Sequence, residues 1–260
     1  MQGPIAMSMI CGMATPRPGT DGSTGLHARL VETLGMAICG RELPPGRVLF
    51  IDELVAQHAV SRSVVREALR VLSSMGLVAS RRRVGTLVLD ASWWNVYDPL
   101  VIRWRLATDG RIAQLRSITE LRTAVEPQAA RLAAARVRPI DASELVTLAG
   151  RLWAAGQDGR MDDFLQLDIE FHHRVLTASG NEMFEHLHQP IAEVLSGRHA
   201  YGLMPSHPHV DALQMHADVA SSIQRGDGER AHDAMVAIMN RTMDETRHLW
   251  DMQSQSTTPA

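Results

Sequence analysis

Lysine is missing from this 260-residue sequence, so all 26 basic residues are arginines. This bias fits genomic base composition as well as any chemistry, and it excludes no function. Cysteine is almost missing too, with Cys11 and Cys39 as the only two. They form neither a disulfide framework nor the closely spaced pair of a zinc motif. A small disulfide-stapled domain and a cysteine-based zinc finger are therefore excluded.

Long hydrophobic runs are also missing. No stretch reaches the roughly 18 consecutive apolar residues of a membrane-spanning helix, and the first residues lack the basic region and solid apolar stretch of an export signal. Apolar residues still make up 45% of the chain, enough to bury a sizeable core. We expect a soluble, cytoplasmic protein with no membrane partner, a disordered leader over residues 1–22 and a frayed tail over residues 251–260.

Common catalytic motifs are absent. The sequence has no H-E-x-x-H, no G-x-S-x-G, no glycine-rich phosphate loop and no plausible cysteine nucleophile. This pattern favours a binding protein over an enzyme. A metal-dependent hydrolase remains a remote alternative.

Charge is distributed unevenly along the chain. Residues 23–89 hold nine arginines and five acidic residues, whereas residues 90–260 hold sixteen arginines and 23 acidic residues. A small basic module therefore precedes a larger acidic one. The asymmetry suggests two functions, and the basic module is expected to bind a negatively charged partner.

The basic module has the pattern of a winged helix-turn-helix. Residues 26–40 space apolar side chains as a helix does, and the Pro-Pro-Gly turn leads into a short extended piece. Residues 51–60 and 61–76 predict two further helices, and Ser61 is a natural N-cap for the second. Two β-rich runs then flank R-R-R-V-G, which predicts a hairpin with a basic tip.

Such a module binds double-stranded DNA with the start of its recognition helix and with its wing. We predict base or phosphate contacts by four residues at the helix start and phosphate or minor-groove contacts by three wing residues. They are Ser61, Arg62, Ser63 and Arg66, and then Arg81, Arg82 and Arg83. The alternative for the bare helix pair is a solvated α-hairpin, which the wing and the charge shift disfavour.

These residues carry a family resemblance. It is carried by L-P-P-G-R-V-L-F, then by V-S-R-S-V-V-R-E-A-L-R-V-L, G-L-V and the basic wing. Together, about residues 25–89 resemble the winged-helix domain of GntR-family transcription regulators. The resemblance implies that the predicted DNA contacts are shared. It departs at Ile51-Asp52-Glu53, where the family often has an arginine between two acids. The operator sequence is expected to differ accordingly.

The rest of the chain predicts an aromatic-rich connector over residues 90–107 and an all-α antiparallel bundle over residues 108–250. Trp93, Trp94, Tyr97 and Trp104 have large areas to bury, so the connector is expected to pack against one or both domains, or else only to cap the second core. Six helical patterns without a β-run follow, over residues 111–136, 141–155, 161–179, 181–197, 210–225 and 228–250. The predicted fold class is therefore mainly α, with a small β-hairpin wing.

A candidate metal site lies within the bundle. Asp168 and His172 are four residues apart and share a helix face, and His216 sits among apolar residues of another predicted helix. A carboxylate and imidazoles from separate helices are a familiar metal-binding set, although an Asp/His pair at this spacing is more often a surface ion pair. The other histidines of the bundle are expected on the surface or in loops.

The bundle resembles the FCD effector domain of the FadR-like branch of the family over about residues 108–250. In that domain an aspartate and three histidines commonly hold a divalent metal beneath an effector pocket, which implies Zn or Ni at Asp168, His172 and His216. The fourth ligand is replaced by Ile238. Three ligands would leave the metal open to water or effector, or leave the site unfilled.

A narrower likeness concerns the effector. The connector and the following E-L-R-T-A-V-E-P-Q-A-A-R are similar to galactonate-operon repressors, which implies a sugar acid such as galactonate or gluconate. Arg122 could clamp its carboxylate or form an ion pair with Glu126 instead, and His172 and His216 could bind it directly. Asn240 and Arg241 are further candidate effector contacts.

The resulting prediction is a homodimeric regulator that binds a palindromic operator and responds to a small carboxylate. A repressor is favoured over an activator. A regulator that senses another organic acid and an architectural DNA binder without an effector remain alternatives.

Overall fold

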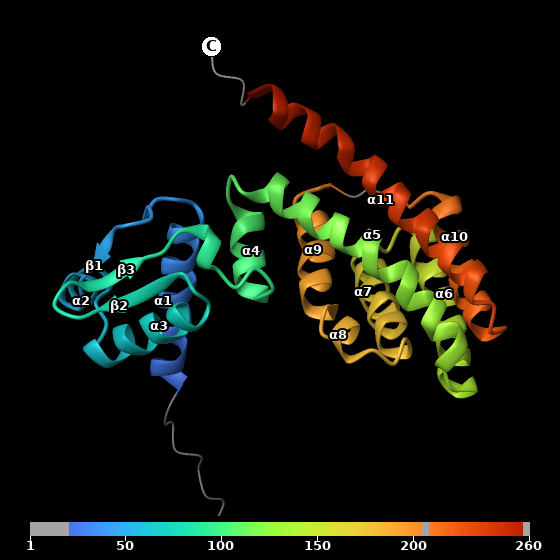
Figure 1. The fold of residues 1–260 in the computed structure, drawn as a ribbon, viewed down its shortest axis with the longest axis horizontal. Helices are drawn as coiled ribbons and strands as arrows, with labels where there is room; N and C mark the ends of the chain where they lie inside the picture. The colour runs from blue at the N-terminus through green and yellow to red at the C-terminus, as the bar shows by residue number, and fades with distance from the viewer. Residues whose placement is uncertain (1–20, 204–207, 257–260) are drawn as a thin grey trace, which may run out of the picture.

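The computed structural model describes residues 21–203 and 208–256. Figure 1 shows two lobes joined by a short helix, with the three strands at one end and a helical bundle at the other. The predicted leader lies almost wholly outside the described residues. No helix among those described has an apolar stretch long enough to cross a membrane.

The first lobe contains three helices and a small antiparallel sheet of order β1-β3-β2. Its elements are α1 (Asp21–Cys39), β1 (Val48–Leu49), α2 (Ile51–His58), α3 (Arg62–Ser74), β2 (Val78–Arg81) and β3 (Gly85–Val88). Apolar side chains of all three helices and all three strands form one core. The predicted winged helix-turn-helix is confirmed.

The joint between α2 and α3 is tight. Ala59 ends α2 with a left-handed φ of 51°, and the Ser61 hydroxyl accepts a hydrogen bond of 3.3 Å from the amide of Val64. The predicted N-cap is therefore present. In the wing, Arg81 faces Gly85 across the hairpin, and Arg83 at the tip also adopts a positive φ of 63°.

The connector forms a 3₁₀ turn, Ala91–Trp93, and then helix α4, Pro99–Ala107. Trp104 is fully buried in the core of the first lobe, which confirms packing for this side chain. Trp93 and Tyr97 are 71% and 53% exposed, so the expectation that they are buried is wrong. Trp93 ends the 3₁₀ turn, and Tyr97 lies between that turn and α4.

In the described part of the chain, the bundle is built from seven helices after α4. They are α5 (Arg111–Arg136), α6 (Pro139–Gln157), α7 (Met161–Ala178), α8 (Glu182–Glu185), α9 (His188–Ala200), α10 (Val210–Gln224) and α11 (Gly228–Ser256). Helix α5 packs along α11, and α10 packs against both α11 and α6. A core rich in leucine and alanine fills the space between them.

Two predicted boundaries in the bundle are wrong. Residues 181–197 were expected to form one helix, but they form α8 and part of α9. Pro190 lies in the first turn of α9, where its missing N–H costs no helical hydrogen bond, and it disfavours a helix that runs through from residue 181. The second boundary is the end of α11, which continues to Ser256 and not to residue 250.

Candidate functional site

The predicted DNA-contacting residues all lie on the surface of the winged helix-turn-helix. The seven side chains at the start of α3 and on the wing are exposed: Ser61, Arg62, Ser63, Arg66, Arg81, Arg82 and Arg83. The Ser61 and Ser63 hydroxyls lie 2.8 Å apart. The structure therefore leaves these groups available to a nucleic acid, although no DNA contact is part of it.

Arg62 has a partner that the sequence analysis did not assign. Its Nη2 lies 2.6 Å from Oδ1 of Asp52 on α2, and both side chains are more than half exposed. An ion pair in water contributes at most about 1 kcal/mol. This pair therefore orients Arg62 but is too weak to prevent its binding to a phosphate or a guanine. Asp52 is the middle residue of Ile51-Asp52-Glu53, where the resemblance leads us to expect an arginine, and this pairing is a consequence of that departure.

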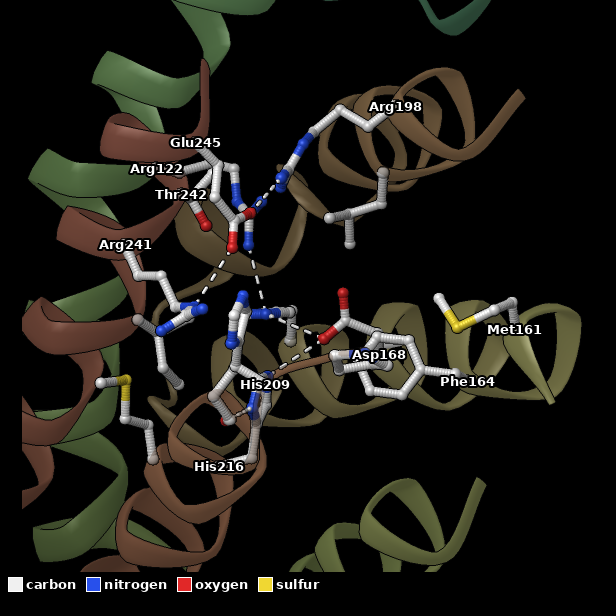
Figure 2. Close-up of a pocket in the computed structure, with 16 residues that line it drawn as sticks. Arg122, Met161, Phe164, Asp168, Arg198, His209, His216, Arg241, Thr242 and Glu245 are labelled. Atoms are coloured by element: carbon white, nitrogen blue, oxygen red, sulfur yellow. Dashed lines mark hydrogen bonds and ion pairs between the residues drawn. The ribbon is translucent and has the colours of Figure 1, made fainter. Parts of the chain in front are cut away.

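The bundle contains a pocket lined by residues of α5, α7, α9, α10 and α11. Its empty space measures about 570 Å³, part of which opens to solvent. Figure 2 shows that arginines and Glu245 line one end, while Asp168 and His216 lie at the other. A pocket into which several polar side chains converge is suited to a small organic molecule.

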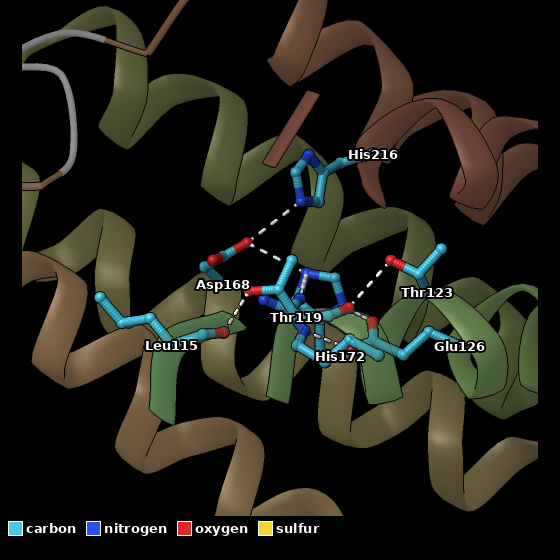
Figure 3. Close-up of polar contacts among 8 residues, drawn as sticks. Leu115, Thr119, Thr123, Glu126, Asp168, His172 and His216 are labelled. Carbon is cyan, nitrogen blue, oxygen red and sulfur yellow. Dashed lines mark hydrogen bonds and ion pairs between the residues drawn. The ribbon is translucent and has the colours of Figure 1, made fainter. Parts of the chain in front are cut away.

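The predicted metal ligands meet at this pocket. Asp168 Oδ1 lies 3.1 Å from His216 Nε2 and 3.5 Å from His172 Nε2. The three side chains are 5%, 2% and 4% exposed in the order Asp168, His172 and His216. Asp168 and His172 are therefore not a surface ion pair. Among the described residues, these three have ligand atoms within 4.8 Å of one another, as Figure 3 shows.

Outer contacts orient both histidines for this role. His216 Nδ1 lies 2.7 Å from the carbonyl oxygen of Ala212, which requires a proton on Nδ1 and leaves the lone pair on Nε2. His172 Nδ1 contacts Oε2 of Glu126 on α5, so its Nε2 also faces Asp168. Metal-binding histidines are usually held by a carboxylate or carbonyl in this manner. The sequence analysis missed the contact between Glu126 and His172, because nothing in the spacing of α5 and α7 indicates it.

The site also shifts the pKa values of its members. Burial lowers the pKa of His172, but the carboxylates of Glu126 and Asp168 outweigh burial and raise it to about 9. Burial raises the pKa of Glu126, yet Arg122 and His172 hold it at about 2. Burial likewise opposes ionisation of Asp168, whereas His172 and His216 keep its pKa well below the usual range. Both carboxylates are therefore charged at neutral pH.

Arg122 is enclosed at 1% exposure and has two contacts. Its Nε lies 2.5 Å from Glu126 Oε1, which is the ion pair that the sequence analysis held open as an alternative. Its Nη2 lies 3.2 Å from His172 Nε2. Arg122 also lines the pocket, so the ion pair leaves part of the guanidinium facing the space where an effector would bind.

Two charged pocket residues, Arg198 and Glu245, were not predicted. Arg198 of α9 is 3% exposed, and its Nη2 donates to Glu245 Oε2 of α11 at 2.8 Å. The other oxygen of Glu245 accepts from Arg241 Nε at 3.1 Å. Arg241 was predicted and does line the pocket. Only packing of α9 against the bundle reveals that Arg198 is buried, since its neighbours Ser196 and His199 give no such signal.

Asn240 does not reach the pocket. It is exposed on α11, whereas Ile238, Arg241, Thr242 and Glu245 line the pocket from the same helix. Those four follow the spacing of one helix face, and Asn240 lies about 200° around the helix from Ile238. Ile238 does project beside the metal-ligand group, where it offers no ligand atom.

The remaining histidines of the bundle are partly as expected. His186 is exposed, while His173 and His188 are half-buried and stack with ring centroids 4.4 Å apart. His209 precedes α10 and is exposed, but it also lines the pocket. His207 lies outside the described residues.

Two family models match the chain. The model described as "Bacterial regulatory proteins, gntR family" matches residues 26–88, and the FCD domain model matches residues 117–241. The first match covers the winged helix-turn-helix. The second runs from α5 into α11 and includes the pocket.

Curated relatives match over most of their length. The chain is 29% identical over 222 residues to the galactonate operon transcriptional repressor of Escherichia coli, covering 84% of this chain and 96% of the relative. It is 31% identical over 225 residues to a protein of the same organism named for regulation of the L-lactate dehydrogenase operon, covering 80% and 82%. A solved structure of Lar, described as controlling the Listeria monocytogenes agr system, aligns with a TM-score of 0.51 at 15% identity over 90% of this chain and all of that one, which indicates a shared fold.

Proposed function

Because this chain belongs to the GntR family of bacterial regulatory proteins and carries an FCD domain, we propose that it is a transcriptional repressor that a sugar acid releases from its operator. The winged helix-turn-helix binds DNA, and the pocket of the bundle binds the acid. Since operator DNA lies in the cytoplasm, the protein acts there. The proposal assigns no catalytic reaction to the chain.

The observation that carries the proposal is the composition of the pocket. Three arginines, Arg122, Arg198 and Arg241, line one pocket together with three imidazoles. Guanidinium groups bind carboxylates with paired hydrogen bonds, and imidazoles can bind hydroxyl groups. The likeness to a galactonate operon repressor supports an aldonate as the ligand. The likeness to a protein named for the L-lactate dehydrogenase operon supports a shorter hydroxy acid as the second candidate.

We also propose that Asp168, His172 and His216 hold a divalent ion, Zn or Ni. The donor set fits, because the Nε2 atoms of two histidines and one carboxylate oxygen converge in a buried place, and a bound ion would displace the proton that His172 carries at neutral pH. Bound there, the ion would supply a Lewis-acidic position open to the effector. Ile238 provides no fourth protein ligand.

Release from DNA requires that the pocket and the winged helix are coupled. Helix α4 packs against α1 of the first lobe and against α9, the helix that carries Arg198. Arg103 of α4 also binds Glu193 of α9 through two hydrogen bonds of 3.0 and 2.5 Å. A shift of α9 on effector binding would therefore move α4 and reorient the two winged helices of a dimer.

A panel of acids tests the effector. We expect galactonate or gluconate to raise the melting temperature and to release the protein from the DNA upstream of its own gene. Lactate and a fatty acyl thioester serve as comparison ligands. A response to lactate or to the thioester alone would rule out a sugar acid, and stronger DNA binding with the aldonate would identify an activator.

Elemental analysis tests the metal. Protein purified without chelator should contain close to one Zn or Ni per chain, and His216→Ala should remove it. His188→Ala is the matched control, because His188 lies outside the metal-ligand group. An unchanged metal content in His216→Ala would place the ion elsewhere.

A further inference from the structure

Two guanidinium N–H groups inside the pocket have no acceptor. Nη1 of Arg122 and Nε of Arg198 are fully enclosed, and neither has a hydrogen-bond partner among the residues that the structure describes. Buried donors in proteins are nearly always paired, and a charged donor is the most costly to leave unpaired. Both side chains line the pocket that is proposed to bind the effector.

Within the described residues, each arginine is hydrogen-bonded to one carboxylate. Glu126 binds Nε of Arg122, and Glu245 binds Nη2 of Arg198. Glu245 is shared, since its second oxygen accepts from Arg241. The two unpaired N–H groups therefore point to a further acceptor that comes from outside the chain.

Electrostatics favours an anion as that acceptor. Burial lowers the pKa of Arg198, and Glu245 opposes this effect, but the positive charge of Arg122 lowers the pKa further, so the two guanidinium groups repel each other. A carboxylate fits this role, because it can offer one oxygen to each of the two nitrogens. It also has the size of the Glu126 and Glu245 carboxylates, which already bind other N–H groups of the same two arginines. Figure 2 shows Arg122 and Arg198 converging at the end of the pocket away from His216.

We infer that Arg122 Nη1 and Arg198 Nε form a carboxylate subsite beside the Asp168, His172 and His216 group, which Arg122 contacts at His172, and that Arg198 makes the pocket select acids over neutral polyols. The inference rests on the proposed effector site and specifies its polarity. The carboxylate of the ligand binds at the arginine end. Its hydroxyl groups extend toward the histidines, with or without a metal ion.

Arg198→Gln and Glu245→Gln are a matched pair of variants. Both break the ion pair between α9 and α11, so a purely structural role of that pair would make them behave alike. Only Arg198→Gln removes a donor from the subsite. Glu245→Gln keeps both donors and removes a negative charge beside the incoming carboxylate.

Calorimetric titration with galactonate and with galactitol, its neutral analogue, gives the readout. We expect Arg198→Gln to weaken galactonate binding about tenfold or more and galactitol binding less than twofold. Glu245→Gln should bind galactonate as tightly as the unaltered protein or more tightly. Equal losses for acid and polyol in Arg198→Gln would overturn the inference.

Acetate separates this inference from the choice of sugar acid. At tens of millimolar it should raise the melting temperature of the unaltered protein, with or without a chelator, and have no such effect on Arg198→Gln. If no aldonate binds at all, the sugar-acid proposal fails while the acetate comparison still decides the subsite. Stabilisation by acetate that disappears with the chelator would place the carboxylate on the metal and refute the arginine subsite.

Discussion

Asp168 and Glu170 lie two residues apart on α7 and have opposite surroundings. Asp168 is 5% exposed and binds two histidines, whereas Glu170 is half-buried and pairs with Arg174 at 2.6 Å. Removing one partner of a buried pair commonly costs about 3–5 kcal/mol, while a surface pair contributes at most about 1 kcal/mol. Substitutions at Asp168 will therefore affect folding as well as binding, and the melting temperature of each pocket variant should be measured alongside its binding.

Arg66 is expected to read DNA sequence. Arg66→Ala should cost about 1–3 kcal/mol at the operator, because an arginine at the start of a recognition helix can bind guanine through two hydrogen bonds. Arg70→Ala is the matched control, since Arg70 is an exposed arginine one turn further along α3 and pairs with Glu67. Mobility shifts on the upstream region measure both. Equal effects of the two substitutions would remove Arg66 from base contacts.

Cys39 is expected to be unreactive in the folded protein. Burial raises the pKa of its thiol to about 12, against a smaller opposite effect of Arg105. The neutral thiol is the poor nucleophile, so a Cys11→Ser variant should react with iodoacetamide at pH 8 only after unfolding in urea. Because the unfolded thiol ionises above its ordinary pKa of 9.0, stability should fall as the pH rises from about 9 towards 12. Rapid labelling of the native variant would contradict this.

Helix α4 links the two lobes through closely packed glycines. A Cβ on Gly35 of α1 would lie 2.4 Å from the ring of Trp104, and a Cβ on Gly197 of α9 would lie 2.8 Å from Leu106 Cδ1. Both glycines are buried, and both partner side chains belong to α4. The absence of a side chain at these two points lets α4 contact α1 on one face and α9 on another.

Gly35→Ala should destabilise the protein by about 1–3 kcal/mol, because the added methyl group meets the Trp104 ring. In an open helix position the same change stabilises the protein by up to about 1 kcal/mol. Gly150→Ala is the control, since a Cβ on Gly150 would have no neighbour within 4 Å. Trp104→Phe added to Gly35→Ala should recover stability. The Trp104 indole N–H has no acceptor among the described residues, so the smaller ring loses no hydrogen bond. Urea denaturation measures all three, and a stabilised Gly35→Ala would disprove the packing argument.

The whole molecule joins one small winged helix-turn-helix to one large helical bundle. A single winged helix covers too few base pairs for operator specificity, which favours a homodimer on a palindromic site. The first lobe is basic and the rest of the chain is acidic, so only the first lobe has the charge that suits DNA. DNA binding by the intact protein should therefore depend strongly on salt.

The expected solution mass is twice the 28.6 kDa of one chain, and the footprint should contain two half-sites about 10 base pairs apart or a multiple of that. Sedimentation equilibrium and footprinting measure these. Neutralising one wing residue, as in Arg82→Ala, should flatten the salt dependence by about one unit of slope and weaken all DNA similarly. A monomeric protein with a single half-site would contradict the dimer.

Local patterns in the sequence determined the elements and the family. Helical spacing, the Ser61 cap and the Arg-rich hairpin sufficed for the winged helix-turn-helix, because these signals act within a few residues. The same holds for Asp168 and His172, which one helical turn brings together. His216 was predicted from its apolar neighbours and a family likeness, and the packing of α10 brings it within 3.1 Å of Asp168.

Tertiary structure alone decided the surroundings of those groups. It brought Glu126 to His172, Arg198 and Glu245 to the pocket and Trp104 to Gly35, and it kept Asn240 on the far side of α11. Each of these contacts joins elements that are distant in the chain or depends on which face of a helix is covered. Burial depends on how the helices pack, and it sets the strength of every electrostatic interaction in the pocket. No local sequence pattern encodes it.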